Sequence, residues 1–258
     1  MKTGIITILT GMVALASCSI IVDCIDGNGI MKSEERTASS FTAIANETSF
    51  NVVYVQGSEY NITVDAESNI MPYITTDIRG GALEVSTLRG SHCLRYSTQP
   101  VITVTAPYIS ELVNAGSGDI VAGDLEGEDV KLVASGSGKI FAGAVAGEDV
   151  SVVVSGSGNI QTDEISSTTF KATLSGSGDL TVSGTTMDSR HVVSGSGSVY
   201  SGDLVTKTAV ITMSGSGSVH TTVDDRLDAV ISGSGNIYLK GNPDLSITRT
   251  GSGRIIHL

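Results

Sequence analysis

The sequence predicts an all-β chain folded as a parallel β-solenoid, a stack of coils of about 20 residues that follows an N-terminal β-hairpin cap. The first observation behind this is a tripeptide, Gly-Ser-Gly, which returns eight times between Gly116 and Gly253 with spacings of 20, 20, 20, 19, 20, 18 and 18 residues. A fixed period near twenty is typical of one unit stacked on copies of itself. The second observation is an alternation of apolar and polar residues around each copy, and the third is the lack of a helical period.

An aliphatic column follows the tripeptide. The residue four positions after its first glycine is aliphatic in every copy: Ile120, Ile140, Ile160, Leu180, Val199, Val219, Ile237 and Ile255. Positions two and four before that glycine are also mostly apolar. Because side chains alternate between the two faces of a strand, these even offsets share one face, which we expect to point into the core. Both glycines of the tripeptide also lie at even offsets and therefore on the inner face, where a missing side chain permits a tight bend or a close backbone approach.

The odd offsets are polar, and we expect them to face outward. The residue before the tripeptide is serine in five successive copies: Ser135, Ser155, Ser175, Ser194 and Ser214. Stacked in a row, these small side chains would form a flat face that could bind a glycan, a repetitive ligand or another solenoid. The alternative is that serine beside a turn simply tolerates the bend, and the sequence leaves both interpretations open.

The repeats are neither a helical array nor a flexible linker. Glycine costs about 1 kcal/mol per position relative to alanine inside a helix, so two glycines per repeat exclude a helical array. A flexible glycine-serine linker would not hold an aliphatic column in register. The remaining residues of each repeat carry further apolar pairs, such as Val145 with Val150, which indicate two or three short strands per coil.

Residues 1–17 have the features of a bacterial lipoprotein signal peptide. Lys2 supplies the positive start, Ile5 to Ala16 form an apolar run too short to span a bilayer, and Leu-Ala-Ser-Cys resembles a lipobox that ends at Cys18. The lipobox implies cleavage before Cys18 and a lipid on its sulfur; the alternative is ordinary secretion. Ser19 after the cysteine favours, by resemblance to known sorting rules, the outer membrane.

The charge of the chain argues against nucleic acid as a partner. Residues 1–17 contain one lysine and no acidic residue, so the processed chain has 14 basic and 27 acidic residues, a net charge of −13. Such a chain is repelled by nucleic acid and by anionic lipid. We expect its acidic residues to form a solvated surface.

Residues 18–36 are glycine-containing and charged, and they predict a flexible tether. Two thiols remain after lipidation, Cys24 in this tether and Cys93 in an apparent loop. In an oxidising compartment they could form a disulfide, but the sequence does not decide whether they do.

Residues 37–111 lack the tripeptide but still predict strands, and they are expected to cap the solenoid that runs over residues 112–258. The stretches 50–55 and 61–64 resemble the two strands of a hairpin, and the stretches 73–78 and 82–86 flank Gly80-Gly81, a stronger hairpin signal. A cap protects the first coil, whose open edge would otherwise pair with other chains.

These features together resemble a known family. The order Phe41-Thr-Ala-Ile44, the stretch 50–57, the Gly80-Gly81 hairpin, the stretch 100–104 and the following Ser-Gly-Ser-Gly repeats look like the head-GIN-domain family, labelled "putative auto-transporter adhesins" and common as envelope lipoproteins of Bacteroides-type bacteria. The resemblance covers about residues 37–258. It implies a right-handed parallel β-helix and a role in adhesion, and it carries no catalytic motif.

No catalytic or metal-binding pattern stands out. Gly136-Ser-Gly138-Lys139 lacks the spacing and the following Ser or Thr of a phosphate-binding loop. Asp129 and Asp149 fall at equivalent positions of adjacent coils and Asp188 at the same offset two coils after Asp149; solvated turns explain them better than acid–base catalysis or calcium binding. We therefore expect no enzyme activity, no cofactor and no metal site.

These observations favour a non-catalytic cell-envelope lipoprotein, an adhesin or surface binding module that presents the solenoid to a glycan or protein ligand. The first alternative is an envelope scaffold formed by solenoid self-association, with the edge at residues 255–258 as the candidate contact of a homo-oligomer. The second alternative is a carbohydrate-active β-helix enzyme. The membrane would be contacted through the N-terminal lipid, and the sequence does not say on which face of the outer membrane the protein lies.

Overall fold

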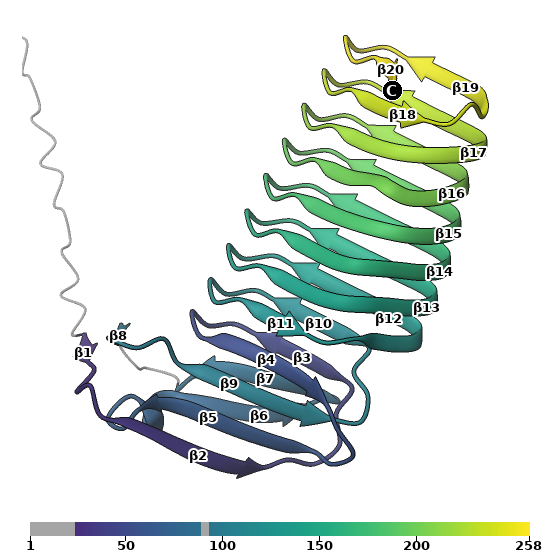
Figure 1. Ribbon diagram of the computed structural model, residues 1–258. Helices are drawn as coiled ribbons and strands as arrows, with labels where there is room; N and C mark the ends of the chain where they lie inside the picture. Colours follow the sequence, from purple (N-terminus) through teal and green to yellow (C-terminus); the bar gives the residue numbers. More distant parts are fainter. Residues whose placement is uncertain (1–23, 89–92) are drawn as a thin grey trace, which may run out of the picture.

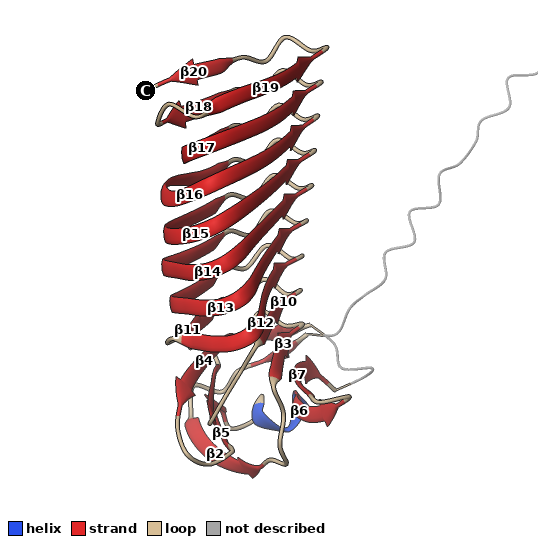
Figure 2. Cartoon of the chain, turned by 90° about the vertical axis from the view of Figure 1, so that its right-hand side faces the viewer, coloured by secondary structure: helices blue, strands red, loops and turns tan. Residues whose placement is uncertain are grey.

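The computed structural model describes residues 24–88 and 93–258, and these form a parallel β-solenoid standing on a mixed β cap (Figure 1). Six long strands each wrap most of the way around one coil: β12 (Leu125–Ala134), β13 (Ile140–Val154), β14 (Ile160–Leu174), β15 (Leu180–Val193), β16 (Val199–Met213) and β17 (Val219–Ile231). Shorter strands complete the stack: β10 (Glu111–Asn114) and β11 (Ile120–Ala122) at its start, β18 (Ile237–Lys240), β19 (Asp244–Arg249) and β20 (Ile255–His257) at its end. Figure 2 shows the coils lying one above another.

The pairing is parallel and joins equivalent residues of successive repeats. Ile140 of β13 pairs with Ile160 of β14, and the ladder between these strands skips Gly143 and Glu148, so β13 consists of three segments joined by bends. The predicted solenoid, with coils of about 20 residues built from two or three strands, is confirmed. Within residues 24–88 and 93–258, no helix is long and apolar enough to cross a membrane.

The aliphatic column forms the core of the solenoid, as its parity predicts. Seven of its eight members are fully buried, from Ile120 to Ile237, and Ile255 of the last coil packs against them. Burying one such side chain contributes about 1.5–3 kcal/mol relative to leaving it exposed. The stack therefore owes its stability to aliphatic side chains that touch their equivalents in the coils above and below.

The tripeptide glycines are required because of close backbone approach. A Cβ atom on Gly136, Gly156 or Gly176 would lie 2.0 Å from the carbonyl oxygen of the equivalent glycine in the preceding coil. None of the tripeptide glycines has a left-handed φ, so the restriction is steric. A side chain in these turns would force neighbouring coils apart.

The cap begins with a coil that lacks the tripeptide. β3 (Ala43–Asn46) pairs with β10 and β4 (Asn51–Gln56) pairs with β11, which places Thr48 at the position of Gly116 and Phe50 at that of Gly118. No tripeptide turn precedes this one, so side chains fit here. The Thr48 hydroxyl donates to Asn46 Oδ1 at 2.7 Å, and Phe50 is buried in the core.

The rest of the cap differs from the prediction in one pairing. β5 (Asn61–Glu67) does not form a hairpin with β4, because β9 (Val101–Ala106) lies between them, parallel to β4 and antiparallel to β5. The connection after Gln56 is long enough to pass over an inserted strand. The other predicted hairpin is confirmed: β6 (Ile74–Arg79), which follows a short 3-10 helix (Met71–Tyr73), pairs with β7 (Ala82–Thr87). Gly80 and Gly81 have φ of 57° and 83°, the left-handed conformation that a tight hairpin turn needs.

The prediction of a flexible tether over residues 18–36 was wrong for residues 24–36. β1 (Ile25–Asp26) pairs with β8 (Leu94–Arg95), and β2 (Met31–Thr37) pairs along its whole length with β5. The charged run is one strand: Arg36 is paired with Glu34 at 3.0 Å and donates to the carbonyl oxygen of Ile74 at 2.8 Å. The predicted signal peptide, Cys18 and the rest of the tether lie outside the described residues.

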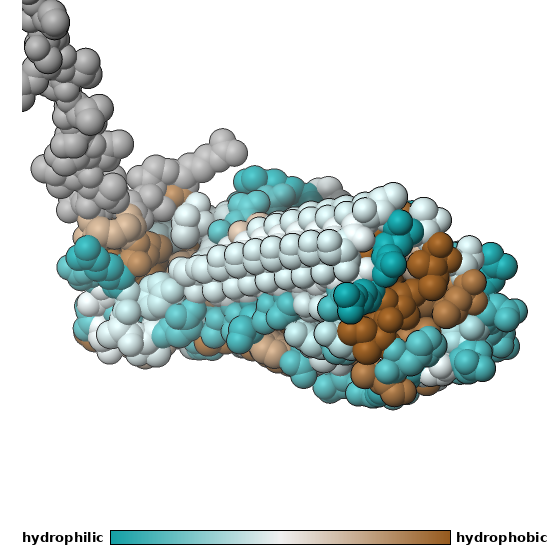
Figure 3. All heavy atoms as spheres, turned by 90° about the horizontal axis from the view of Figure 1, so that it is seen from above, coloured by the Kyte–Doolittle hydropathy of each residue, from teal (hydrophilic) through white to brown (hydrophobic). Residues whose placement is uncertain are grey.

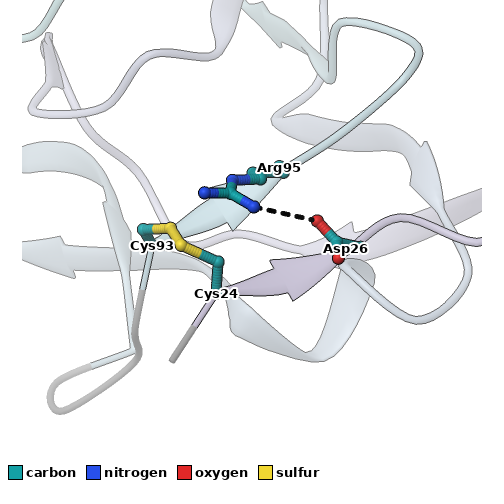
Figure 4. The surroundings of a disulfide bond; sticks show 4 residues. All are labelled: Cys24, Asp26, Cys93 and Arg95. Atoms are coloured by element: carbon teal, nitrogen blue, oxygen red, sulfur yellow. Dashed lines mark ion pairs between the residues drawn. A yellow bond between two sulfur atoms is a disulfide. The ribbon is translucent and has the colours of Figure 1, made fainter. Parts of the chain in front are cut away.

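Two further contacts hold this N-terminal segment on the cap. Cys24 and Cys93 form a disulfide, which answers the question that the sequence left open, and Asp26 and Arg95 lie 3.8 Å apart beside it (Figure 4). The buried carboxylate of Glu67 accepts hydrogen bonds from the Ser97 hydroxyl and the backbone N–H groups of Gly29, Ser97 and Thr98. These bonds, above all the one from the Ser97 hydroxyl, lower the pKa of Glu67 to about 2.

One core residue makes the stability of the solenoid depend on pH. His191 is buried in an otherwise mostly aliphatic column beside Phe170, with ring centroids 5.9 Å apart, and neither of its nitrogens has a hydrogen-bond partner among the described residues. Burial lowers the pKa of His191 from 6.5 to about 4. In this interval the unfolded chain binds a proton that the folded chain does not bind, so stability falls as the pH falls.

We expect His191→Leu to remove this dependence. The difference in unfolding free energy between the variant and the wild type should grow by about 3 kcal/mol in favour of the variant as the pH falls from 7 to 4. Urea unfolding at several pH values measures it. The carboxylate of Glu67 is common to both proteins, so its contribution cancels in the difference. A difference that does not change with pH would contradict the buried neutral histidine.

Candidate functional site

The five serines predicted as a ligand face form one exposed row along the solenoid. Ser135 donates its backbone N–H to Asn114 of the coil before, and Ser155 does the same to Ala134, both at 2.9 Å, so successive serines stack at the coil spacing. Figure 3 shows pale rows along the solenoid, the hydropathy colour shared by serine, glycine and threonine. The row is flat because its side chains are small, and its role as a ligand face remains a prediction.

A second outward column, which the sequence analysis missed, carries aromatic side chains. It occupies the position five residues after the first glycine: Val121, Phe141, Gln161, Thr181, Tyr200, His220, Tyr238 and Ile256. The pairing of β16, β17 and β18 brings Tyr200, His220 and Tyr238 into direct register. Their rings stack, with centroids 5.2 Å apart in the first pair and 4.5 Å apart in the second. Four aromatic rings at one repeat position, of Phe141, Tyr200, His220 and Tyr238, were the signal in the sequence.

The surface beside these rings is hollowed. A hollow of about 410 Å³ is lined by the three stacked rings and by polar side chains that include Asp163, Asp203 and Lys240. A smaller hollow of about 140 Å³ reaches Phe141. The two share Gln161, Thr181 and Tyr200 in their linings, and together we call them the aromatic groove.

The groove exists because the coils are irregular at the corner that directly follows the aromatic column in each coil. Leu180 pairs with Ile160, 20 residues before it, but Gly184 pairs with Ile165, 19 residues before it, so one residue is missing from this corner of β15. Gly184 takes up the bend with a φ of +114°. In the opposite sense, residues 202–204 of β16 form a bulge relative to β17, because Ser201 pairs with Thr221 while Val205 pairs with Thr222. Asp203 of this bulge is exposed, whereas Leu204 is buried in the core. The shortened corner leaves space, and the bulge forms one wall.

Charges lie on this wall. Lys240 Nζ lies 3.2 Å from Asp203 Oδ1 and donates to the carbonyl oxygen of Gly202 at 3.3 Å. His220 is partly buried between the two tyrosines, and burial, followed by the charge of Lys240, lowers its pKa. His220 is therefore neutral at neutral pH, and the groove presents ring surfaces, carboxylates, side-chain amides and the ammonium groups of Lys139 and Lys240.

The stacked aspartates are not arranged for catalysis. Asp129 and Asp149 are paired across β12 and β13, as their offsets predict, but Asp149 lies 2.7 Å from Lys171, whose hydrogen bond lowers its pKa. A general acid needs a raised pKa, so Asp149 is the wrong kind of carboxyl group. Asp188 accepts a hydrogen bond from the Thr208 hydroxyl. In the described part of the chain, no three His, Cys, Asp or Glu residues are grouped as metal ligands.

The chain is similar to a known family and to several solved structures. Residues 40–243 match the family described as "Putative auto-transporter adhesin, head GIN domain". A protein from Parabacteroides distasonis, named a "putative lipid binding protein", shares 27% identity with a TM-score of 0.84, over 92% of this chain and 100% of that one. A "putative adhesin" from Parabacteroides merdae shares 22% identity with a TM-score of 0.79, over 92% and 99% of the two chains.

A third structure, a "putative adhesin" from Bacteroides fragilis, shares 20% identity with a TM-score of 0.70, over 91% of this chain and 100% of that one. The likeness to the two adhesins concerns the fold alone. No curated protein matches the chain.

Proposed function

Because the chain belongs to the head GIN domain family of auto-transporter adhesins, as the match over residues 40–243 shows, we propose that it is a non-catalytic binding module of the cell envelope. In this proposal a lipid on Cys18 anchors the chain in the outer membrane, and the solenoid presents an outer side to a glycan or protein ligand. The family and the related structures are consistent with a place at the cell surface or in the envelope, and none of them carries the name of an enzyme.

The observation that carries this proposal is the aromatic groove on a rigid stack of coils. The exposed rings stand on one column of residues that pair at every step from Phe141 of β13 through Tyr200 of β16 to Tyr238 of β18, so a binding surface exists before any ligand arrives. Preorganisation of this kind lowers the entropy cost of binding. The carboxylates of Asp163 and Asp203 line the groove as hydrogen-bond acceptors, and Asp203 lies 3.2 Å from Lys240 Nζ.

The cap supports anchoring at its own end of the molecule. Cys24 follows Cys18 by six positions, and the disulfide of Cys24 fixes the chain to the cap. Six extended residues span at most about 20 Å, so a lipid on Cys18 would hold the cap close to the membrane and direct the solenoid away from it. A disulfide also fits an oxidising compartment such as the envelope.

Cys18→Ala tests the anchoring. We expect the variant to lose incorporation of labelled palmitate and to move from the membrane fraction to the soluble fraction, because the acceptor sulfur is gone. Cells that carry the variant should also lose any binding of fluorescent polysaccharides or proteins that cells with the wild-type chain show. Cys24→Ala is the matched control and should keep the lipid. Membrane retention of Cys18→Ala would contradict the lipoprotein proposal.

A second function, an envelope scaffold, is favoured by one observation. Leu245 and Ile247 on β19 are 42% and 48% exposed, and an apolar area is visible there (Figure 3). A second copy of the chain could cover these side chains. We expect Ile247→Lys to abolish any concentration-dependent dimer seen by sedimentation velocity, because a charge would be buried in the contact. A wild-type protein that stays monomeric at all concentrations would exclude this scaffold.

A further inference from the structure

We infer that the aromatic groove binds a neutral oligosaccharide, with the open face of the Tyr200 ring stacked on one sugar ring. The inference rests on the proposed function and deepens it, since it places the ligand on a named surface and states its chemistry. The groove, and not the serine row, is then the binding site.

The stacking order leaves one ring face of Tyr200 free. His220 covers Tyr200 on the side of β17, and Tyr238 covers His220 in turn. On the other side of Tyr200, the next two members of the column are Thr181 and Gln161, which have no ring. Tyr200 is 43% exposed, and both hollows of the groove lie against it. The space over Thr181 is therefore bounded by an aromatic face that no protein ring covers.

The dimensions fit an extended chain of sugar rings. The groove runs along the solenoid from Phe141 to Tyr238, five strand spacings apart in the ladder, or about 24 Å at ~4.8 Å per spacing. Phe141 and Tyr200 are three spacings apart, so rings bound the space over Gln161 and Thr181 at both ends. A ligand of several linked sugar rings can occupy this length, whereas a single small molecule would fill only one of the two hollows.

The chemistry of the lining suits sugar hydroxyl groups. Each hydroxyl both donates and accepts, and the groove offers carboxylate acceptors at Asp163 and Asp203, a donor at Lys240 and both kinds of group on Gln161. The C–H groups on the face of a sugar ring carry partial positive charge and are attracted to the negative face of an aromatic ring. A few polar groups beside an aromatic surface are the features expected of a specific ligand site.

Charge distinguishes this ligand from others. The carboxylates of Asp163, Asp179 and Asp203 in the lining of the groove outnumber the ammonium groups of Lys139 and Lys240. Lys240 is already paired with Asp203, and the whole chain has a net charge of −12. Nucleic acid and acidic polysaccharides would be repelled. A lipid tail would displace water from these charged groups without offering hydrogen bonds in its place, which is costly. A neutral polar ligand meets neither penalty.

The test measures binding of the purified full-length lipoprotein, in detergent, to an array of immobilised neutral oligosaccharides, with the strongest partner then titrated by calorimetry. Phospholipid vesicles and a basic peptide serve as probes for the other ligand classes. We expect Tyr200→Ala to weaken carbohydrate binding at least ten-fold, since it removes the open ring face. Thr181→Tyr should weaken it as much by filling the groove with a further ring, while leaving the fold intact. Tyr108→Ala is the matched control, because Tyr108 is also exposed but does not line the groove.

The outcomes separate this inference from the proposed function. Carbohydrate binding that survives both Tyr200→Ala and Thr181→Tyr would overturn the groove as the site, while the binding function would stand and the serine row would become the candidate surface. Binding of vesicles or the basic peptide that both groove variants weaken, without carbohydrate binding, would overturn the ligand class. Loss of binding in both groove variants but not in Tyr108→Ala, with unchanged thermal unfolding, would confirm the inference.

Discussion

Gly156→Ala is expected to destabilise the solenoid by about 3 kcal/mol or more, because overpacking against rigid backbone cannot relax. The added Cβ would lie 2.0 Å from the carbonyl oxygen of Gly136 and 2.5 Å from that of Ser135. Both atoms belong to the turn of the preceding coil, whose backbone is held by parallel pairing, so neither can move without breaking the ladder. Urea unfolding followed by circular dichroism measures the loss.

The chain offers a control with the same substitution. A Cβ on Gly123 would meet no atom within 4 Å, and its φ is not left-handed, so Gly123→Ala should be neutral or stabilise the fold by up to about 1 kcal/mol. Ser157→Ala, in the same turn as Gly156 but exposed, should change the stability by less than about 0.5 kcal/mol. Equal stabilities of Gly156→Ala and Gly123→Ala would contradict the requirement for glycine at positions of close backbone approach.

Loss of the disulfide is expected to cost about 4 kcal/mol in the chain-entropy model, since Cys24 and Cys93 are 69 residues apart in the sequence. Cys93→Ser should release β1 from β8, because that parallel pair comprises only two residues on each strand. The change is measured as the shift of the urea midpoint, and limited proteolysis with N-terminal sequencing should detect new cleavage near residue 25.

The solenoid itself should survive this change. The ladders from β10 to β20 do not include β1 or β8, so Cys93→Ser should lower the stability of the cap and leave circular dichroism in the native state nearly unchanged. Reduction of the wild type with dithiothreitol is the matched treatment and should give the same midpoint. An unchanged midpoint and proteolysis pattern in both would mean that β2 and Glu67 hold the N-terminal segment without the disulfide.

The repeat made the solenoid predictable, because its signal is local and returns eight times. Gly156 and Ile160 could be assigned to the inner face from parity alone, and the structure places them there. The cap was less predictable, because strand order is decided by contacts between distant segments: β9 separates β4 from β5, and no pattern within residues 50–64 reports that insertion. The charged stretch around Arg36 likewise predicted a tether, because Arg36 donates to the carbonyl oxygen of Ile74, which is distant in the sequence.

The candidate site was predicted only in part. The serine row stood out because five identical residues share one position, whereas the aromatic column varies from coil to coil and was not recognised. The sequence contains Tyr200, His220 and Tyr238 at one repeat position, but it does not show that the shortened corner at Gly184 hollows the surface beside them. The groove results from a residue that is missing from one repeat. An alignment of the repeats by identical residues does not indicate that a missing residue leaves a hollow.

The proposed role as a surface adhesin requires the solenoid to stand on the outside of the cell. Protease treatment of intact cells, followed by detection of a tag placed after Leu258, tests it most directly. The proposal predicts that the tag disappears while a periplasmic marker stays intact. A tag that survives until the outer membrane is broken would contradict the surface adhesin and place the binding module in the periplasm.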